Sequence, residues 1–433
     1  MLSAFARAFR TPDLRRKLLF TIGIMVVFRV GSFLPTPGVS YPNVQACIDQ
    51  VGNDSSLLGL VNLFSGGALL QLSVFALGIM PYITASIIIQ LLRVVIPRFE
   101  ELHKEGQSGT AKLTQYTRYL TIALAVLQST TIITVARSGQ LFAGCTLDVI
   151  PDSSVVTLLV MVITMTAGTG LIMWLGELIT ERGIGNGMSL LIFTSIAATF
   201  PTAMWSIAGG AGGIGKFIIV LAVIVLVIAL VVFVEQSQRR IPVQYAKRMV
   251  GRRMYGGSST YIPIKLNMSG VIPIIFASSL LQIPTLAAQF GDQTSGWVQW
   301  VSLNLAPSDA GLHIALYVLL IIFFCYFYTA ITFNPDEVAD NMKRYGGFIP
   351  GIRAGRPTAE YLDYVITRIT APGSLYLAAV ALIPTVVFIL LGINAATIPF
   401  GGSSILIIVG VGLETVKQIQ SQLEQRHYEG FLR

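Results

Sequence analysis

Long uninterrupted apolar runs constrain this chain more than any other feature of its sequence. A helix needs about 20 apolar residues to cross the roughly 30 Å hydrocarbon core of a bilayer. Runs that approach this length lie near residues 18–36, 74–92, 119–137, 154–176, 185–203, 217–235, 268–289, 312–332, 373–391 and 403–416. A transmembrane barrel would instead show alternation over about ten residues. We therefore predict an all-α polytopic membrane protein with ten transmembrane helices.

Composition agrees with this prediction and removes other classes of protein. Of the 433 residues, 54% are hydrophobic and only 12% are charged, whereas soluble domains carry about 25% charged residues. Intrinsic disorder and a secreted enzyme are excluded. Cys47, Cys145 and Cys325 are few, odd in number and not spaced as metal ligands. We expect neither a disulfide scaffold nor a metal site.

The basic residues fall almost entirely on one side of the predicted membrane. When the loops are assigned alternately to the two faces, 26 of the 29 Lys and Arg residues lie on one of them. By the positive-inside rule that face is the cytoplasm, and both termini lie there. The first run ends at Pro35 and Pro37 and not at a cleavage site, so we expect it to be retained. Within it we interpret Arg29 as a structural residue that snorkels to the outer surface.

The ten runs divide into two halves of five, residues 1–209 and 210–433. Because five is odd, the second half enters the membrane from the opposite side, which is the condition for an inverted repeat. Residues 78–86 and 270–278 both read G-x-x-P-x-I-x-A-S. Proline bends helices, so we predict two equivalent bent helices that form mobile walls between the halves. The alternative is that these small residues only permit close packing.

A short apolar stretch precedes the second run. We predict a helix over residues 57–67, which is too short to cross a membrane and ends at Gly66 and Gly67. It either folds back into a cavity between the halves or lies on the lipid surface.

Residues for catalysis or ion coupling are missing. No carboxylate lies at mid-depth in any run, which argues against a proton antiporter. Residues 210–216 read G-x-x-x-x-G-K, but Phe217 stands where a phosphate loop needs Ser or Thr. We expect no catalytic residue, no metal and no cofactor, so that any nucleoside triphosphate energy comes from a partner.

Two long basic loops, residues 236–267 and 333–372, lie on the predicted cytoplasmic face. Alternation of polar and apolar residues in the first predicts a projecting hairpin. These loops either anchor topology and touch anionic lipid or dock a large acidic or RNA-containing partner.

Four motifs together resemble the bacterial SecY family, the central subunits of protein-translocation channels. They are residues 78–83 (GIMPYI), 181–187 (ERGIGNG), 239–248 (RRIPVQYAKR) and 333–339 (FNPDEVA). The resemblance covers essentially the whole chain. It implies two pseudo-symmetric halves around an hourglass pore, a lateral gate between the second and seventh helices, and a plug at the short helix. The implied function is a passive, non-enzymatic channel for secretion of unfolded polypeptides and for lateral insertion of helices.

The resemblance also implies roles for individual residues. The pore ring would be Ile83, Ile87, Met188, Ile192, Ile275 and Ile407, and Met188 departs from the isoleucine that is common there. The plug would comprise Leu60, Val61, Asn62, Leu63, Phe64, Ser65, Gly66 and Gly67. The lateral gate would comprise Pro81, Ser86, Gln90, Asn267, Pro273, Ser278 and Gln282. Docking would use Arg239, Arg240, Lys247, Arg248, Arg353 and Arg356.

The implied partners are the SecE and SecG subunits, the SecA ATPase, the ribosome, SecDF accessory proteins, preproteins with signal peptides, and the lipid bilayer. The implied location is the bacterial cytoplasmic membrane. A secondary transporter of a small solute, built from inverted repeats, is the alternative function.

Overall fold

The structure is a computed structural model and is mainly helical. It describes residues 9, 11–51, 65–139, 141, 145, 147–152, 154–209, 213–245, 248–250, 253–255, 259–290, 295–307, 310–392 and 402–430. The helices are α2 (Pro12–Phe33), α3 (Tyr41–Val51), α5 (Met80–Val95), α6 (Pro97–Lys104), α7 (Gln107–Arg137), α8 (Val155–Arg182), α9 (Gly187–Gly209), α10 (Gly213–Gln236), α11 (Ile272–Phe290), α12 (Gly296–Asn304), α13 (Gly311–Thr332), α14 (Pro335–Arg344), α15 (Arg356–Leu390) and α16 (Gly402–Gly430). The strands are β1 (Gln238–Tyr245), β2 (Arg248–Val250), β3 (Arg253–Tyr255), β4 (Ser259–Lys265) and β5 (Gly347–Phe348).

Each predicted apolar run overlaps one helix, and these helices are α2, α5, α7, α8, α9, α10, α11, α13, α15 and α16. The start of the second run, residues 74–79, forms turns before α5. By length and composition, six helices in the described part of the chain could cross a membrane, or seven if the bent pair α5–α6 counts as one span. Large apolar side chains such as Val26 on α2 and Phe233 on α10 are exposed. Such exposure is stable in lipid rather than water, and the chain is a multi-pass membrane protein.

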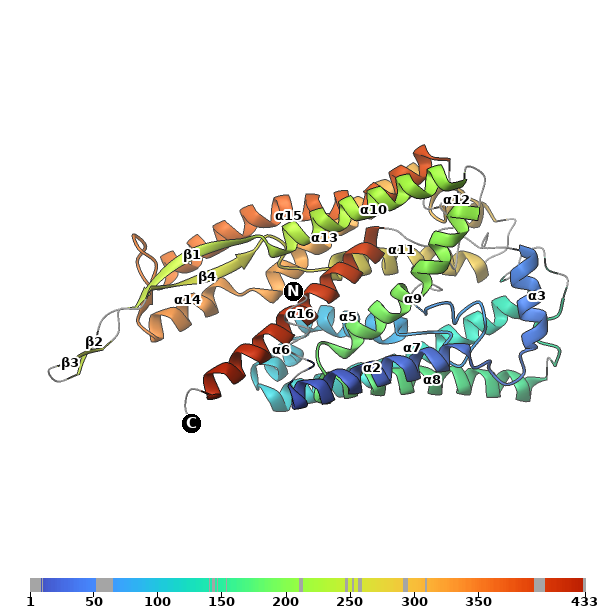
Figure 1. The fold of residues 1–433 in the computed structure, drawn as a ribbon, viewed down its shortest axis with the longest axis horizontal. Helices are drawn as coiled ribbons and strands as arrows, with labels where there is room; N and C mark the ends of the chain where they lie inside the picture. The colour runs from blue at the N-terminus through green and yellow to red at the C-terminus, as the bar shows by residue number, and fades with distance from the viewer. Residues whose placement is uncertain are drawn as a thin grey trace.

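The loops gather at two opposite ends of the molecule (Figure 1). The strands, α14, the beginning of α2 and the end of α16 lie toward one end, and α3 and α12 lie toward the other. This arrangement agrees with the alternating assignment of loops made from the sequence.

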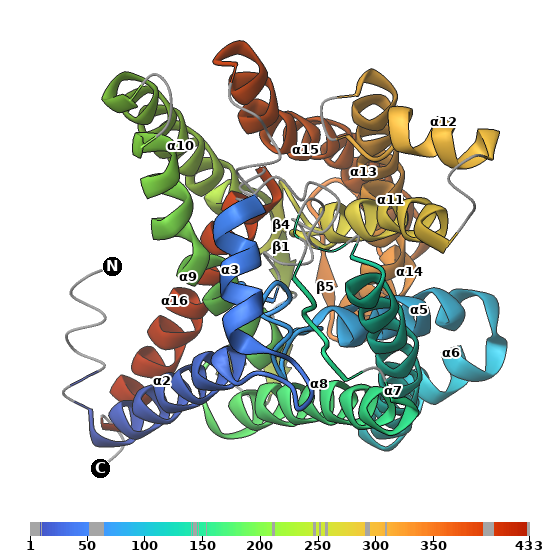
Figure 2. The same ribbon diagram turned by 90° about the vertical axis from the view of Figure 1, so that its right-hand side faces the viewer.

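Viewed along this axis, helices α2 to α8 lie on one side and α11 to α15 on the other (Figure 2). Helix α9 packs against α8 of the first half and against α10 and α16 of the second. The central apolar cluster draws buried residues from both halves, including Ile172 on α8 and Leu377 on α15. The two halves therefore share one hydrophobic core.

The repeated G-x-x-P motif starts a helix in both halves. Gly78 and Gly270 have φ values of 56° and 62°, in the left-handed region that favours glycine. Helices α5 and α11 begin two residues later, which places Pro81 and Pro273 in the first turn. A proline there removes no helical hydrogen bond. The expectation that these prolines bend the two helices is therefore wrong, although the repeat itself has a structural counterpart.

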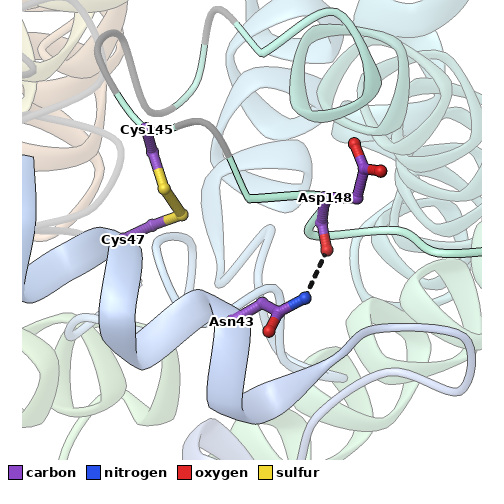
Figure 3. The surroundings of a disulfide bond; sticks show 4 residues. All are labelled: Asn43, Cys47, Cys145 and Asp148. Carbon is purple, nitrogen blue, oxygen red and sulfur yellow. Dashed lines mark hydrogen bonds between the residues drawn. A yellow bond between two sulfur atoms is a disulfide. The ribbon is translucent and has the colours of Figure 1, made fainter.

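The end that carries α3 contains a disulfide bond between Cys47 and Cys145 (Figure 3). Nearby, Nδ2 of Asn43 donates to the carbonyl oxygen of Asp148 at 2.7 Å, and the Ser40 amide donates to Val149 at 3.0 Å. Helix α3 is thus tied to the loop between α7 and α8. From the odd number of cysteines we expect no disulfide scaffold, and this single bond is not predicted. The two cysteines are 98 residues apart, and the sequence does not indicate that they pair.

At the opposite end β1 and β4 form an antiparallel hairpin, which confirms the projecting hairpin predicted in loop 236–267. Strand β5, from the second basic loop, extends the sheet in the order β4-β1-β5. Helix α15 begins at Arg356, so the last part of the predicted loop 333–372 is helical. Its first turns lie outside the apolar run, and they are stabilised by packing of Leu362 and Ile366 against Ile241 and Val243 of β1.

Candidate pore, gate and docking face

The residues proposed for the pore ring meet in one apolar cluster. Ile192 on α9 and Ile407 on α16 are buried in it. The other four, which are half-buried and pack against it, are Ile83, Ile87, Met188 and Ile275. The six side chains come from α5, α9, α11 and α16, so both halves contribute. A constriction lined by such side chains would exclude ions and water without recognising any particular polypeptide.

The loop before α9 fixes the position of Met188. The Asn186 Oδ1 atom accepts from the Met188 amide at 3.1 Å, and the Gly187 amide donates to Thr180 Oγ1 at 2.9 Å. A Cβ atom on Gly187 would overlap the carbonyl oxygen of Gly176 on α8. The Met188 sulfur also lies against Gly176, so this side chain packs on the wall formed by α8.

Of the residues proposed for the plug, the structure describes Ser65, Gly66 and Gly67, and residues 60–64 lie outside its described part. The Ser65 hydroxyl accepts from the Leu69 amide at 3.1 Å. Gly66 and Gly67 have φ values of 68° and 89°, which only glycine adopts readily. These residues form a turn, so the helix predicted over residues 57–67 does not extend through residues 65–67.

Arg29 lies in α2 and reaches this turn. Its Nη1 atom donates to the Gly66 carbonyl oxygen at 2.7 Å, and its guanidinium carbon lies 5.0 Å from the centre of the Phe33 ring. The side chain is half-buried. The expectation that Arg29 snorkels to the outer surface is therefore corrected, since its hydrogen bond is made inside the protein.

The residues proposed for the lateral gate lie on α5, on α11 and in the segment before α11. Gln90 Nε2 donates to Ser86 Oγ at 3.5 Å, and Ser278 Oγ donates to the Ile275 carbonyl oxygen at 2.9 Å. Each of these partners lies in the same helix as its donor. Pro81 and Pro273 are buried. Gln282 lies in α11, and its side chain is not among those that the structure describes.

Asn267 precedes α11 and has partners that the sequence does not indicate. Its Nδ2 atom donates to Glu235 Oε1 on α10 at 2.7 Å and to the Gly270 carbonyl oxygen at 3.0 Å. Ser269 Oγ in turn donates to Asn267 Oδ1 at 3.1 Å. The sequence marks Glu235 only as a carboxylate near the end of a span. This network joins α10 to the start of α11 within one half.

Basic side chains cover the end that carries the hairpin. Arg239, Arg240, Arg353 and Arg356 are exposed. The Arg240 guanidinium carbon lies 4.8 Å from the centre of the Tyr261 ring on β4, and Arg356 Nε pairs with Glu360 Oε1 at 3.1 Å. Lys247 lies outside the described residues, and Arg248 begins β2 with its side chain undescribed. Arg239 and Arg240 therefore lie on the sheet, whereas Arg353 precedes α15 and Arg356 begins it.

The motif at 333–339 starts α14. The Asn334 Oδ1 atom accepts from the amides of Asp336 and Glu337 at 3.2 and 3.4 Å, and Pro335 occupies the first helical position. These are the preferred residues for a helix start, and the two acidic residues favour the positive end of the helix dipole. The motif thus fixes α14 beside the sheet.

Comparison with known proteins gives consistent matches over the whole chain. The SecY family model matches residues 73–416. The protein translocase subunit SecY of Streptomyces scabiei is 68% identical over 438 aligned positions, and that of Mycobacterium tuberculosis is 60% identical over 443, each covering 100% of both chains. A solved SecY structure, whose plug domain is described as stabilising the closed channel, superposes with a TM-score of 0.61 at 19% identity. That match covers 94% of this chain and 91% of the other, and at this identity it shows the fold.

Proposed function

The chain belongs to the SecY family, and we propose the following roles for its residues in a protein-conducting channel. The chain is a channel subunit of a protein translocase rather than an enzyme. The observation that carries this function is the full-length match at 68% identity to a translocase subunit. A shared apolar core between two halves of the molecule supports it.

The pore ring is the seal around a moving polypeptide. Its six side chains are Ile83, Ile87, Met188, Ile192, Ile275 and Ile407. Aliphatic and thioether groups form no directional bonds, so they can close around chains of any sequence. Met188 differs from the other five in chemistry, and its sulfur lies against Gly176 on α8.

The lateral gate lies between α5 and α11. The hydrogen bonds of Gln90 and Ser278 remain within their own helices, and Asn267 bonds to α10. Separating α5 from α11 therefore need not break these bonds. An apolar signal helix satisfies its own backbone hydrogen bonds, so it can pass sideways into lipid.

The plug comprises residues 60–67 and fills the outer side of the closed channel. Its support is the sequence: a short apolar segment that ends at two glycines and precedes α5 by twelve residues, 68–79. The turn at residues 65–67 fits the end of such a segment, since both glycines adopt positive φ values.

Other proteins supply the energy for transport and the remaining subunits of the complex. The SecA ATPase or the ribosome docks on the basic face formed by Arg239, Arg240, Lys247, Arg248, Arg353 and Arg356, because guanidinium groups bind carboxylates and phosphates. SecE and SecG complete the channel, and SecDF assists it. The chain crosses the bacterial cytoplasmic membrane ten times as two inverted halves, residues 1–209 and 210–433, with both termini in the cytoplasm.

Reconstituted vesicles test this function. The channel with its partner subunits, SecA and ATP is expected to move a secretory precursor into the vesicles, where added protease cannot reach it. Vesicles without ATP and vesicles without the channel are the controls. Uptake of a small solute driven by an ion gradient alone, with no protected precursor, would instead identify the secondary transporter.

A further inference from the structure

Arg29 makes an unusual contact for a residue in an apolar run that is predicted to cross the membrane. Charged side chains within spans are costly and rare, and they tend to mark functional positions. The Arg29 guanidinium bonds to a backbone carbonyl 37 residues away, that of Gly66, rather than to a neighbour on its own helix. It therefore connects the wall formed by α2 to the turn at residues 65–67.

The turn that Arg29 contacts is closely fitted to α9. A Cβ atom on Gly66 would lie 2.9 Å from Arg29 Nη1 and 3.2 Å from the Cα atom of Ser195. Ser195 is buried on α9, with 1% of its surface exposed, and it lies one helical turn beyond Ile192 of the proposed pore ring. The Gly66 backbone thus lies between the guanidinium and α9, near the proposed constriction.

We propose that Arg29 is a positioning residue that clamps the Ser65–Gly67 turn against α9 and so fixes the C-terminal end of the plug in the resting channel. This role rests on the proposed function of the plug. A charged donor makes a stronger hydrogen bond to a carbonyl than a neutral donor does. Because the acceptor is a backbone atom, the clamp holds the turn independently of the side chains on the plug.

The arginine side chain suits this role better than lysine. Its planar guanidinium remains charged and presents several donors in a fixed geometry, so that one face can lie on Phe33 while an edge donates to Gly66. Lysine would keep the charge but lose this pre-organised geometry. We therefore expect arginine at position 29 to hold the turn most firmly, lysine less firmly and methionine least.

A buried reporter next to the clamp tests the proposal directly. Ser65 has 0% of its surface exposed, so Ser65→Cys should react slowly with a membrane-impermeant maleimide added from the outer side. In this background Arg29→Met is expected to raise the labelling rate about tenfold, which corresponds to the loss of one charge-assisted hydrogen bond. Arg29→Lys is expected to give an intermediate rate. The chain without Ser65→Cys gives the background from its native cysteines.

Two further variants control for charge and for folding. Arg137→Met removes another arginine, exposed at the end of α7, and is expected to leave the labelling rate unchanged. Gly66→Ala keeps Arg29 but places a methyl group against Ser195, so it should raise labelling even if Arg29→Met fails to fold. The same vesicles are assayed for resting ion leak, which should rise with the labelling rate.

The outcomes separate the clamp from the proposed function. Unchanged labelling in folded Arg29→Met and Gly66→Ala channels would overturn the clamp, whatever the transport activity. An equal rise in Arg137→Met would also overturn it, because a general loss of charge would then be the cause. If vesicles that contain the unmodified channel protect no precursor from protease, the proposed channel function is contradicted. The labelling rates still report the Arg29–Gly66 contact in that case.

Discussion

The side-chain amide of Asn267 donates to the carboxylate of Glu235 at 2.7 Å, which ties the start of α11 to the end of α10. The resemblance to SecY channels places Asn267 at the lateral gate as a polar contact that tunes opening. In the structure its bonds instead join the start of α11 to α10. We therefore predict that Asn267 affects the proposed gate through the rigidity of this helix pair.

We expect Asn267→Ala to destabilise the channel, because it leaves the half-buried Glu235 carboxylate without this donor. A hydrogen bond to a charged group contributes about 1.5 kcal/mol or more, and the partial exposure of Glu235 favours the lower end. Thermal unfolding of the purified complex measures the effect. Gln90→Ala is the matched control, since it removes only a 3.5 Å contact within α5. Equal melting temperatures for both variants would contradict the structural role of Asn267.

The sequence predicts the positions of the helices well because membrane helices have a simple physical signature. Each apolar run overlaps a helix, but the ends differ: residues 74–79 form turns before α5, whereas α15 begins well before its run. Helix α15 is the clearest case: its early turns are stabilised by Ile366 and Leu362 packing on a β-hairpin. A hydropathy window cannot detect such packing, because it depends on a partner distant in sequence.

Replacement of Gly187 by alanine is expected to prevent α8 and α9 from packing. The new methyl group would overlap the Gly176 carbonyl oxygen and lie 2.8 Å from the Ile179 Cβ atom. Overpacking of this kind costs about 1 to 3 kcal/mol, and more where backbone must move. The yield of folded protein in the membrane measures the effect. Gly170→Ala on α8 is the control, because nothing lies within 4 Å of the place that its methyl group would take, and its yield should remain normal.

The disulfide between Cys47 and Cys145 is expected to stabilise the end of the molecule that carries α3. Removing a disulfide typically costs about 2 to 4 kcal/mol. A reductant should therefore lower the melting temperature of the unmodified protein but not that of a variant with both Cys47→Ala and Cys145→Ala. Mass spectrometry after alkylation should find two additional free thiols only after reduction. Two alkylated thiols without reductant would show that the bond is absent.

The proposed site is less predictable from residues than the fold. Periodicity does not separate Ile192 or Ile407 from neighbouring apolar residues that face lipid, and only the family resemblance singles them out. The Arg29–Gly66 bond is partly predictable, because an arginine within an apolar run indicates that a polar partner lies nearby. The identity of that partner depends on how a loop 37 residues away folds back, which local sequence does not encode.

Deletion of residues 60–67 is expected to raise the ion leak of the resting channel, because it removes the segment proposed to fill the outer side of the pore. Conductance across planar bilayers measures this leak against the unmodified channel. The deletion also removes Gly66, so its leak should exceed that of Arg29→Met, which removes only one restraint. A membrane that stays tight after the deletion would count against the plug assignment.

Arg356→Glu is expected to abolish motor-driven export while leaving the channel folded. Arg356 is exposed at the start of α15, and its ion pair with Glu360 is also exposed, so its contribution to stability is only about 0.3 to 0.5 kcal/mol. Reversal of its charge would place a carboxylate on a face proposed to bind a partner through cations. Glu360→Gln is the matched control, because it breaks the same ion pair and retains the arginine, so its ATP-dependent export should stay normal. Normal export by a folded Arg356→Glu channel would remove Arg356 from the docking face, whereas equal loss in both variants would assign the effect to the ion pair.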